Sequence, residues 1–126
     1  MVQATFSGSE SVPGEVPEGA AIDRSHLSRM TFGNLSLERE VLQLFERQAE
    51  LLLARMRASE PAAVATLAHT LKGSAAGIGA ARVARAACAA ELAASRTPRE
   101  CSQAIDELAH TVDEARTQIA GMLRAH

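Results

Sequence analysis

The clearest structural signal in this 126-residue chain is the stretch TPRECSQAIDELAHTVDEARTQIAGML, residues 97–123. Thr97 is followed by a proline at the first helical position and by Glu100 three residues on, which is typical of a helix N-terminus. Apolar residues then recur every three or four positions, at Ile105, Leu108, Val112, Ala115, Ile119, Met122 and Leu123. This spacing predicts a long amphipathic helix with one face turned toward a core.

The preceding sequence predicts two helices before residue 58. Asp23 is expected to cap a short helix through about Met30, which the residues TFGN (31–34) then interrupt. Ser36 is the expected N-cap of a longer helix that continues to about Arg57. The apolar stripe of this helix consists of Val41, Leu42, Phe45, Ala49, Leu52, Leu53 and Met56.

Two further helices are predicted between residues 59 and 95. The first begins at Ser59 and Pro61 and ends near Ile78, with Gly79 as its stop signal. The second covers about residues 81–95. Its expected inward-facing residues are small alanines together with Val83, Ala87 and Leu92.

These elements predict an all-α fold. Apolar residues make up 47% of the chain and aromatic residues only 2%, and strong helix formers dominate. Four long helices joined by very short turns are expected to pack as antiparallel neighbours. We therefore predict an up-down-up-down four-helix bundle, with the short N-terminal helix lying across one end. Residues 1–19, rich in Ser, Gly, Pro and Glu, are expected to form a flexible tail before a single domain at residues 20–126.

Composition argues against several classes of function. The formal net charge is −2, and neither a Lys/Arg cluster nor stacking aromatic residues indicate nucleic-acid binding. The sequence shows no signal peptide and no apolar run long enough to cross a membrane, so we expect a cytoplasmic protein with no membrane partner. Cys88 and Cys101 lack metal-ligand spacing and are expected to be reduced, partly buried side chains.

The predicted third helix carries an unusual polar group on its outer face. With about 100° per residue, Val64 and Leu71 fall on the core side, whereas His69 and Gly73 fall on the opposite side. Lys72 lies on the flank, one turn from His69. A glycine inside a helix lowers helix stability by about 1 kcal/mol relative to alanine, so the presence of Gly73 at this position calls for an explanation. Open access to the imidazole is one such explanation, and Lys72 would supply positive charge for phosphate oxygens. Gly77 is better explained by close helix packing.

The stretch HTLKGSAAGIGA, residues 69–80, resembles the signature of histidine-containing phosphotransfer (HPt) domains. The resemblance extends more loosely over residues 20–126. It implies that His69 accepts a phosphoryl group from a receiver-domain aspartate and passes it to another receiver in a multistep two-component phosphorelay. It assigns the electrostatic role to Lys72 and the access role to Gly73. The partners would be response-regulator receivers or a hybrid histidine kinase, and any Mg²⁺ would belong to the receiver, with no cofactor on this chain.

The resemblance also implies a polar side chain on the following helix that hydrogen-bonds the imidazole. Glu91 occupies that position, although Arg82 and Arg85 on the same helix could face the site instead. A carboxylate would accept from Nδ1–H and leave Nε2 free to attack.

The sequence is compatible with three classes of function. The favoured one is a monomeric phosphocarrier without autonomous kinase activity, because 126 residues leave no room for an ATP-binding domain. The second is a helical adaptor that docks on receiver or kinase domains without taking the phosphoryl group. The third is a metal-binding bundle, which needs inward-facing Glu-x-x-His pairs, and we expect no Glu-x-x-His sequence in this chain.

Overall fold

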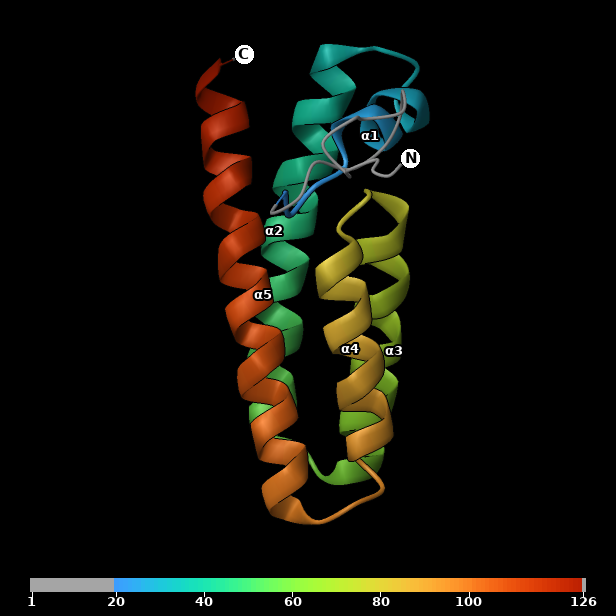
Figure 1. Ribbon diagram of the computed structural model, residues 1–126, viewed down its shortest axis with the longest axis vertical. Coiled ribbons are helices and arrows are strands. Elements are labelled where there is room, and N and C mark those ends of the chain that lie inside the picture. The colour runs from blue at the N-terminus through green and yellow to red at the C-terminus, as the bar shows by residue number, and fades with distance from the viewer. Residues whose placement is uncertain (1–19, 126) are drawn as a thin grey trace, which may run out of the picture.

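The computed structural model describes residues 20–125, and the predicted tail at residues 1–19 lies outside this range. The described residues form five helices and no strand (Figure 1). The helices are α1 (Arg24–Met30), α2 (Leu35–Arg57), α3 (Pro61–Gly77), α4 (Ala81–Ala93) and α5 (Pro98–Ala125).

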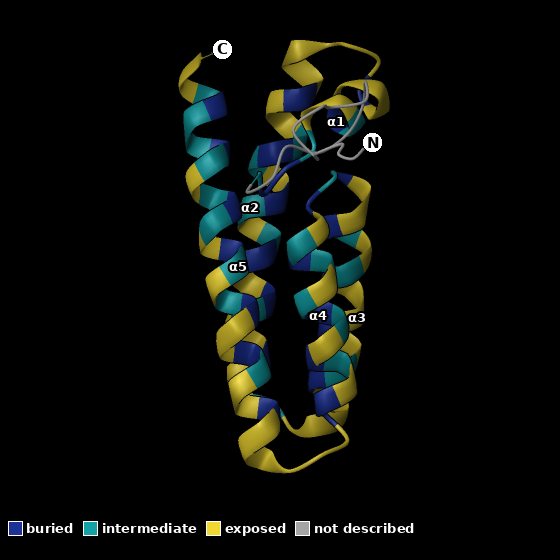
Figure 2. Ribbon diagram, viewed as in Figure 1, coloured by how far each residue is buried: buried dark blue, intermediate teal, exposed yellow. Residues whose placement is uncertain are grey.

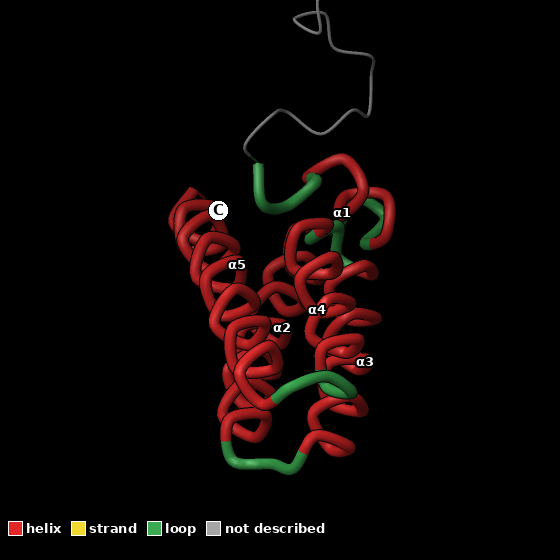
Figure 3. Tube along the Cα trace, turned by 60° about the horizontal axis from the view of Figure 1, so that its bottom comes forward, coloured by secondary structure: helices red, strands yellow, loops and turns green. Residues whose placement is uncertain are grey.

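Helices α2 to α5 form an antiparallel bundle in which each helix packs on the helix before it, and α5 closes the ring against α2. Short loops join the four helices at alternating ends (Figure 3). Helices α3 and α4 are shorter than α2 and α5, and α1 lies across the end of the bundle above the shorter pair (Figure 1). The predicted fold class is therefore confirmed. None of the described helices is both long and apolar enough to cross a membrane.

The core lies along the inner faces of the four long helices, where buried residues follow one another from turn to turn (Figure 2). The predicted apolar stripes of α2 and α5 are confirmed, since their main members are buried. On α3 and α4 the fully buried positions are mostly alanine, at Ala68, Ala75, Ala87 and Ala90. Small side chains on both helices allow the α3–α4 pair to pack closely.

The prediction for Leu92 is wrong, because this residue is 61% exposed. Leu92 follows the buried Val83 by nine residues, which places it about 180° away around the helix axis. The inner face of α4 is instead continued by Ala90 and by Ala94, the C-cap residue of the helix.

The caps agree with the sequence at one helix and differ at another. At α5 the Thr97 hydroxyl accepts from the Glu100 N–H at 3.1 Å, and the Glu100 carboxylate accepts from the Thr97 N–H at 3.3 Å. At α2 the N-cap is Asn34 rather than Ser36, with Asn34 accepting from the Leu37 N–H at 2.9 Å. The turn explains the difference: Phe32 and Gly33 have positive φ, Asn34 is extended, and the helix begins at Leu35, so Ser36 already lies inside it.

The end of α3 is fixed to the segment that enters α1. Gly79 has φ +82°, and its carbonyl accepts from the Asp23 N–H at 2.9 Å. The side chain of His26 lies 3.0 Å from the Gly77 carbonyl through Nε2, which donates to it. Gly77 itself is exposed, and a Cβ there would meet nothing within 4 Å, so the packing explanation for this glycine is wrong.

Candidate functional site

His69 lies on the outer face of α3, as its position on the helix predicts. Its side chain is 66% exposed, whereas its neighbour Ala68 and the next inner residue, Leu71, are fully buried. The imidazole is therefore presented to solvent by a helix whose other face is locked into the core. The imidazole of His69 is therefore held in a fixed place and is open to a partner that approaches from solvent.

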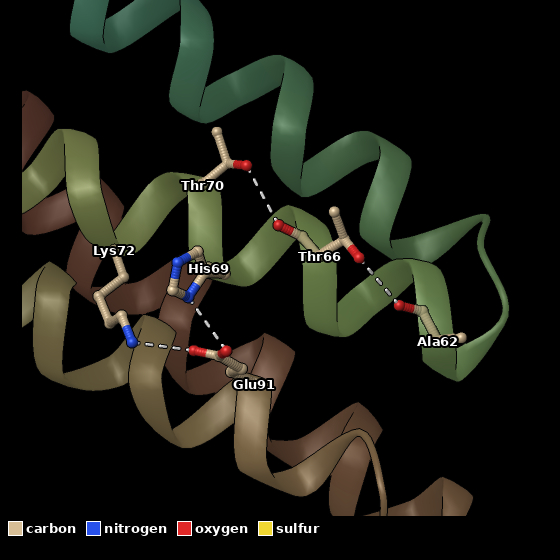
Figure 4. Close-up of polar contacts among 6 residues, drawn as sticks. All are labelled: Ala62, Thr66, His69, Thr70, Lys72 and Glu91. Carbon is tan, nitrogen blue, oxygen red and sulfur yellow. Dashed lines mark hydrogen bonds and ion pairs between the residues drawn. The ribbon is translucent and has the colours of Figure 1, made fainter.

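Glu91 of α4 reaches His69 and Lys72 at the same time. Its Oε2 is 3.1 Å from Nδ1 of His69, and its Oε1 is 3.0 Å from Nζ of Lys72 (Figure 4). One carboxylate thus bridges two side chains of α3 across the α3–α4 interface. The close approach of these helices, lined by alanines, makes that reach possible.

The contact with Glu91 assigns the tautomer of His69. A carboxylate without a proton can only accept a hydrogen bond, so Nδ1 must carry the hydrogen that it donates. The neutral ring then has its lone pair on Nε2. The nitrogen that is free to act as a nucleophile is the one that Glu91 does not occupy.

The electrostatics of the site keep Glu91 charged. The hydrogen bond from Lys72 is the main cause that holds the pKa of the Glu91 carboxyl below its ordinary value, and the hydrogen bond from His69 acts in the same direction. Partial burial opposes both, since the side chain is 29% exposed. The carboxylate is therefore ionised at neutral pH and can accept from both neighbours.

The surface around the ring is open and shallow. Gly73 is exposed, and a Cβ built on it would meet nothing within 4 Å. A hollow beside His69 is lined by Ala65, Thr66 and Thr70 of α3 and by Glu91. The two threonine hydroxyls donate back to carbonyls of their own helix, at Ala62 and Thr66 respectively, as Figure 4 shows. They are engaged in the helix and leave the ring unobstructed.

The two arginines that the sequence left as alternatives to Glu91 lie elsewhere on α4. Arg82 is near the start of the helix, with its guanidinium 3.7 Å from Glu114 of α5. Arg85 lines a hollow next to Asp23 and His26, at the end covered by α1. The structure therefore brings together His69, Lys72 and Glu91, with Gly73 one turn after the histidine.

Sequence reasoning missed the double contact of Glu91. It assigned a carboxylate to the imidazole but gave Lys72 no partner in the resting protein. The signal was present in the spacing, because Lys72 lies three residues after His69 and shares its flank with the ring. A single acceptor on the adjacent helix can serve both.

Metal binding is not indicated by the residues that the structure describes. Across residues 20–125, no group of three or more His, Cys, Asp and Glu side chains is placed to hold a metal ion. One Glu-x-x-His sequence does occur, contrary to expectation, at Glu107 and His110. Both residues are exposed on α5 and do not face the bundle interior.

Comparison with known families gives one result. The model of a family described as Hpt domain matches residues 40–118, which is more than half of the chain and includes His69, Lys72, Gly73 and Glu91. No curated protein and no solved structure gives a significant match.

Proposed function

This chain belongs to the Hpt domain family, and we propose that His69 is the residue on which it carries phosphoryl groups. Hpt domains take part in histidine phosphotransfer in phosphorelays and act as phosphocarrier modules rather than catalysts. For this chain we propose that Nε2 of His69 accepts the group from the phosphorylated aspartate of one receiver domain and delivers it to the aspartate of another.

The observation that carries this proposal is the contact between Nδ1 of His69 and Glu91, at 3.1 Å. It leaves the nucleophilic lone pair on Nε2, in a side chain that is 66% exposed. His26 also has a partner that fixes its tautomer, but there the bonded nitrogen is Nε2, whereas the contact with Glu91 leaves Nε2 of the exposed His69 free to react. An adaptor that only docks on its partners would not need a free nucleophilic nitrogen on an exposed histidine.

We assign two supporting roles on the same surface. Lys72 can turn its ammonium from Glu91 toward the phosphoryl oxygens, where a charge-assisted hydrogen bond stabilises negative charge. Gly73 leaves open space on the face from which a receiver would approach. Neither role requires a cofactor on this chain, and Mg²⁺ would be bound by the receiver.

The partners follow from the family. Hpt domains interact with receiver domains and kinases of two-component systems. We propose that this chain meets its partners as a monomer, because a single exposed site serves one receiver at a time, and that it does so in the cytoplasm. Autonomous kinase activity is not part of the proposal.

The test is transfer of a radioactive phosphoryl label from phosphorylated receivers of the same organism. We expect wild type to take up a label that is labile in acid and stable in alkali, and His69→Gln to take up none while keeping its helical circular dichroism. His110→Gln is the matched control, since His110 is an exposed histidine on α5. Label on His69→Gln at the wild-type level would overturn the assignment, and binding without any transfer would favour the adaptor.

A further inference from the structure

The nitrogen of His69 that contacts Glu91 is not the nitrogen that reacts, and this matters once the ring is phosphorylated. When the Nε2 lone pair bonds to phosphorus, the P–O bond to the receiver aspartate breaks and its electron pair stays on the aspartate carboxylate. The proton on Nδ1 takes no part in this exchange. The phosphorylated ring then has substituents on both nitrogens and is a cation, 3.1 Å from a carboxylate oxygen in the present geometry.

The proton on Nδ1 decides how easily the phosphoryl group leaves again. While the proton is present, an incoming carboxylate oxygen displaces a neutral imidazole, because the electron pair of the breaking N–P bond returns to Nε2. If the proton is lost first, the same displacement must release an imidazolate anion, which is a far poorer leaving group. Retention of this proton therefore favours onward transfer.

We propose that Glu91 is a positioning residue that keeps the Nδ1 proton on phosphorylated His69, so that the phosphoryl group remains transferable at neutral and mildly alkaline pH. The inference rests on the phosphocarrier role proposed above. It assigns Glu91 a function in the second half of the cycle, when the group departs, in addition to selecting the tautomer before it arrives.

The surroundings of the ring support this assignment. An anion next to a titrating group favours its charged form, and Glu91 is the anion that contacts the ring. The hollow beside His69 is lined by residues of α3 and α4 only, and Glu91 is the one titratable group among its described lining residues apart from the ring. The cation on the same side of α3 is Lys72, and its ammonium donates a hydrogen bond to Glu91.

Lys72 must be separated from Glu91 in any test. Replacing Glu91 releases the ammonium of Lys72, which can then bond the phosphoryl oxygens more freely and slow its departure. A change in phosphoryl lifetime alone would therefore not identify the effect on the ring proton. The position of the pH profile does identify it, because that position reports the loss of the ring proton, whereas the hydrogen bonds of Lys72 change the size of the rate.

The experiment loads the protein with potassium phosphoramidate, a chemical phosphoryl donor, so that no partner is needed for phosphorylation. The rate of onward transfer to an unphosphorylated receiver is then measured from about pH 6 to about pH 9, so that the mildly alkaline range named in the proposal is covered. Four forms are compared: wild type, Glu91→Gln, Lys72→Ala and the double variant. Glu107→Gln is the matched control, as it removes an exposed glutamate of α5.

We expect the alkaline decline of the rate to occur at lower pH in Glu91→Gln than in wild type. At the alkaline end the variant should be about threefold slower, a modest factor because the pair is partly exposed to water. The same shift should separate the double variant from Lys72→Ala, and Glu107→Gln should follow wild type. Nitrogen NMR of the phosphorylated wild-type protein should show the Nδ1 proton retained to higher pH than in Glu91→Gln.

Two results would contradict the inference in distinguishable ways. Coincident pH profiles for wild type and Glu91→Gln, with the label on His69, would overturn the role of Glu91 and leave the phosphocarrier function standing. Equal labelling of His69→Gln by phosphoramidate, with the labelled variant still transferring to the receiver, would overturn both.

Discussion

A histidine and a glycine lie close together in two regions, the middle of α3 and the end of the α3–α4 hairpin that α1 covers, and their surroundings are opposite. In the middle, His69 is exposed with Nε2 free, and Gly73 has open space where a side chain would be. At the end, His26 is half-buried with Nε2 bonded to Gly77, and Gly79 has φ +82° with Asp23 pressed against it. In the middle of α3 the histidine and the glycine leave the reactive nitrogen accessible, whereas at the α1-covered end the same residue types fix the backbone conformation.

The strongest way to test this contrast is Gly79→Ala. A Cβ at this position would lie 3.0 Å from the Asp23 carbonyl oxygen, and the positive φ is unfavourable for any L-residue with a side chain. We expect a loss of roughly 3 kcal/mol in the free energy of unfolding, measured by urea denaturation. A loss below about 0.5 kcal/mol, within the usual range for surface substitutions, would show that the α1-covered end does not depend on this backbone conformation.

The next largest effect is expected in the middle region, on transfer rather than on stability. Lys72→Ala should slow transfer from a phosphorylated receiver by a factor corresponding to about 1–2 kcal/mol, as for a charge-assisted hydrogen bond partly exposed to water. Lys72→Arg should recover part of the rate, since it keeps the charge but changes the reach. Stability should change little, because ion pairs that remain partly exposed to water contribute little. Equal rates for Lys72→Ala and wild type would exclude a role of Lys72 in transfer and leave only its hydrogen bond to Glu91 in the resting protein.

The smallest effect completes the comparison of the two glycines. Gly73→Ala should raise the free energy of unfolding by up to about 1 kcal/mol, since alanine is the better helix former and nothing obstructs its Cβ. Urea denaturation beside Gly79→Ala gives the measurement, with opposite signs expected for the two substitutions. If both variants were destabilised, the outer face of α3 would be less open than the structure indicates.

Patterns within single helices were predictable from the sequence, and contacts between helices were not. The capping box at Thr97 and Glu100, the inner stripes of α2 and α5, and the outward position of His69 all depend on residues a few positions apart. Local periodicity and cap chemistry specify such features directly. The errors within helices, at Leu92 and Ser36, came from misjudging the helix face and the residue at which the helix begins.

Contacts across the bundle require the rotation and register of two helices to be known together. Gln118 of α5 illustrates this, because its side-chain oxygen accepts from the N–H groups of Ala21 and Ile22 at 2.8 and 2.9 Å. It ties the segment before α1 to the far end of the chain, and nothing local marks a glutamine for that task. Glu91 is similar: the resemblance placed it beside His69, but its simultaneous bond to Lys72 depends on how closely α3 and α4 approach.

The buried alanines between α3 and α4 have a consequence for the geometry of the polar site. Packed helices are separated by about 8–10 Å according to the side chains between them, and alanine belongs to the short end of that range. A valine or leucine at Ala75 or Ala87 would add apolar surface, yet would push the helices apart and lengthen the reach from Glu91 to His69. The geometry of the polar site therefore depends on the small size of buried residues that do not belong to the site.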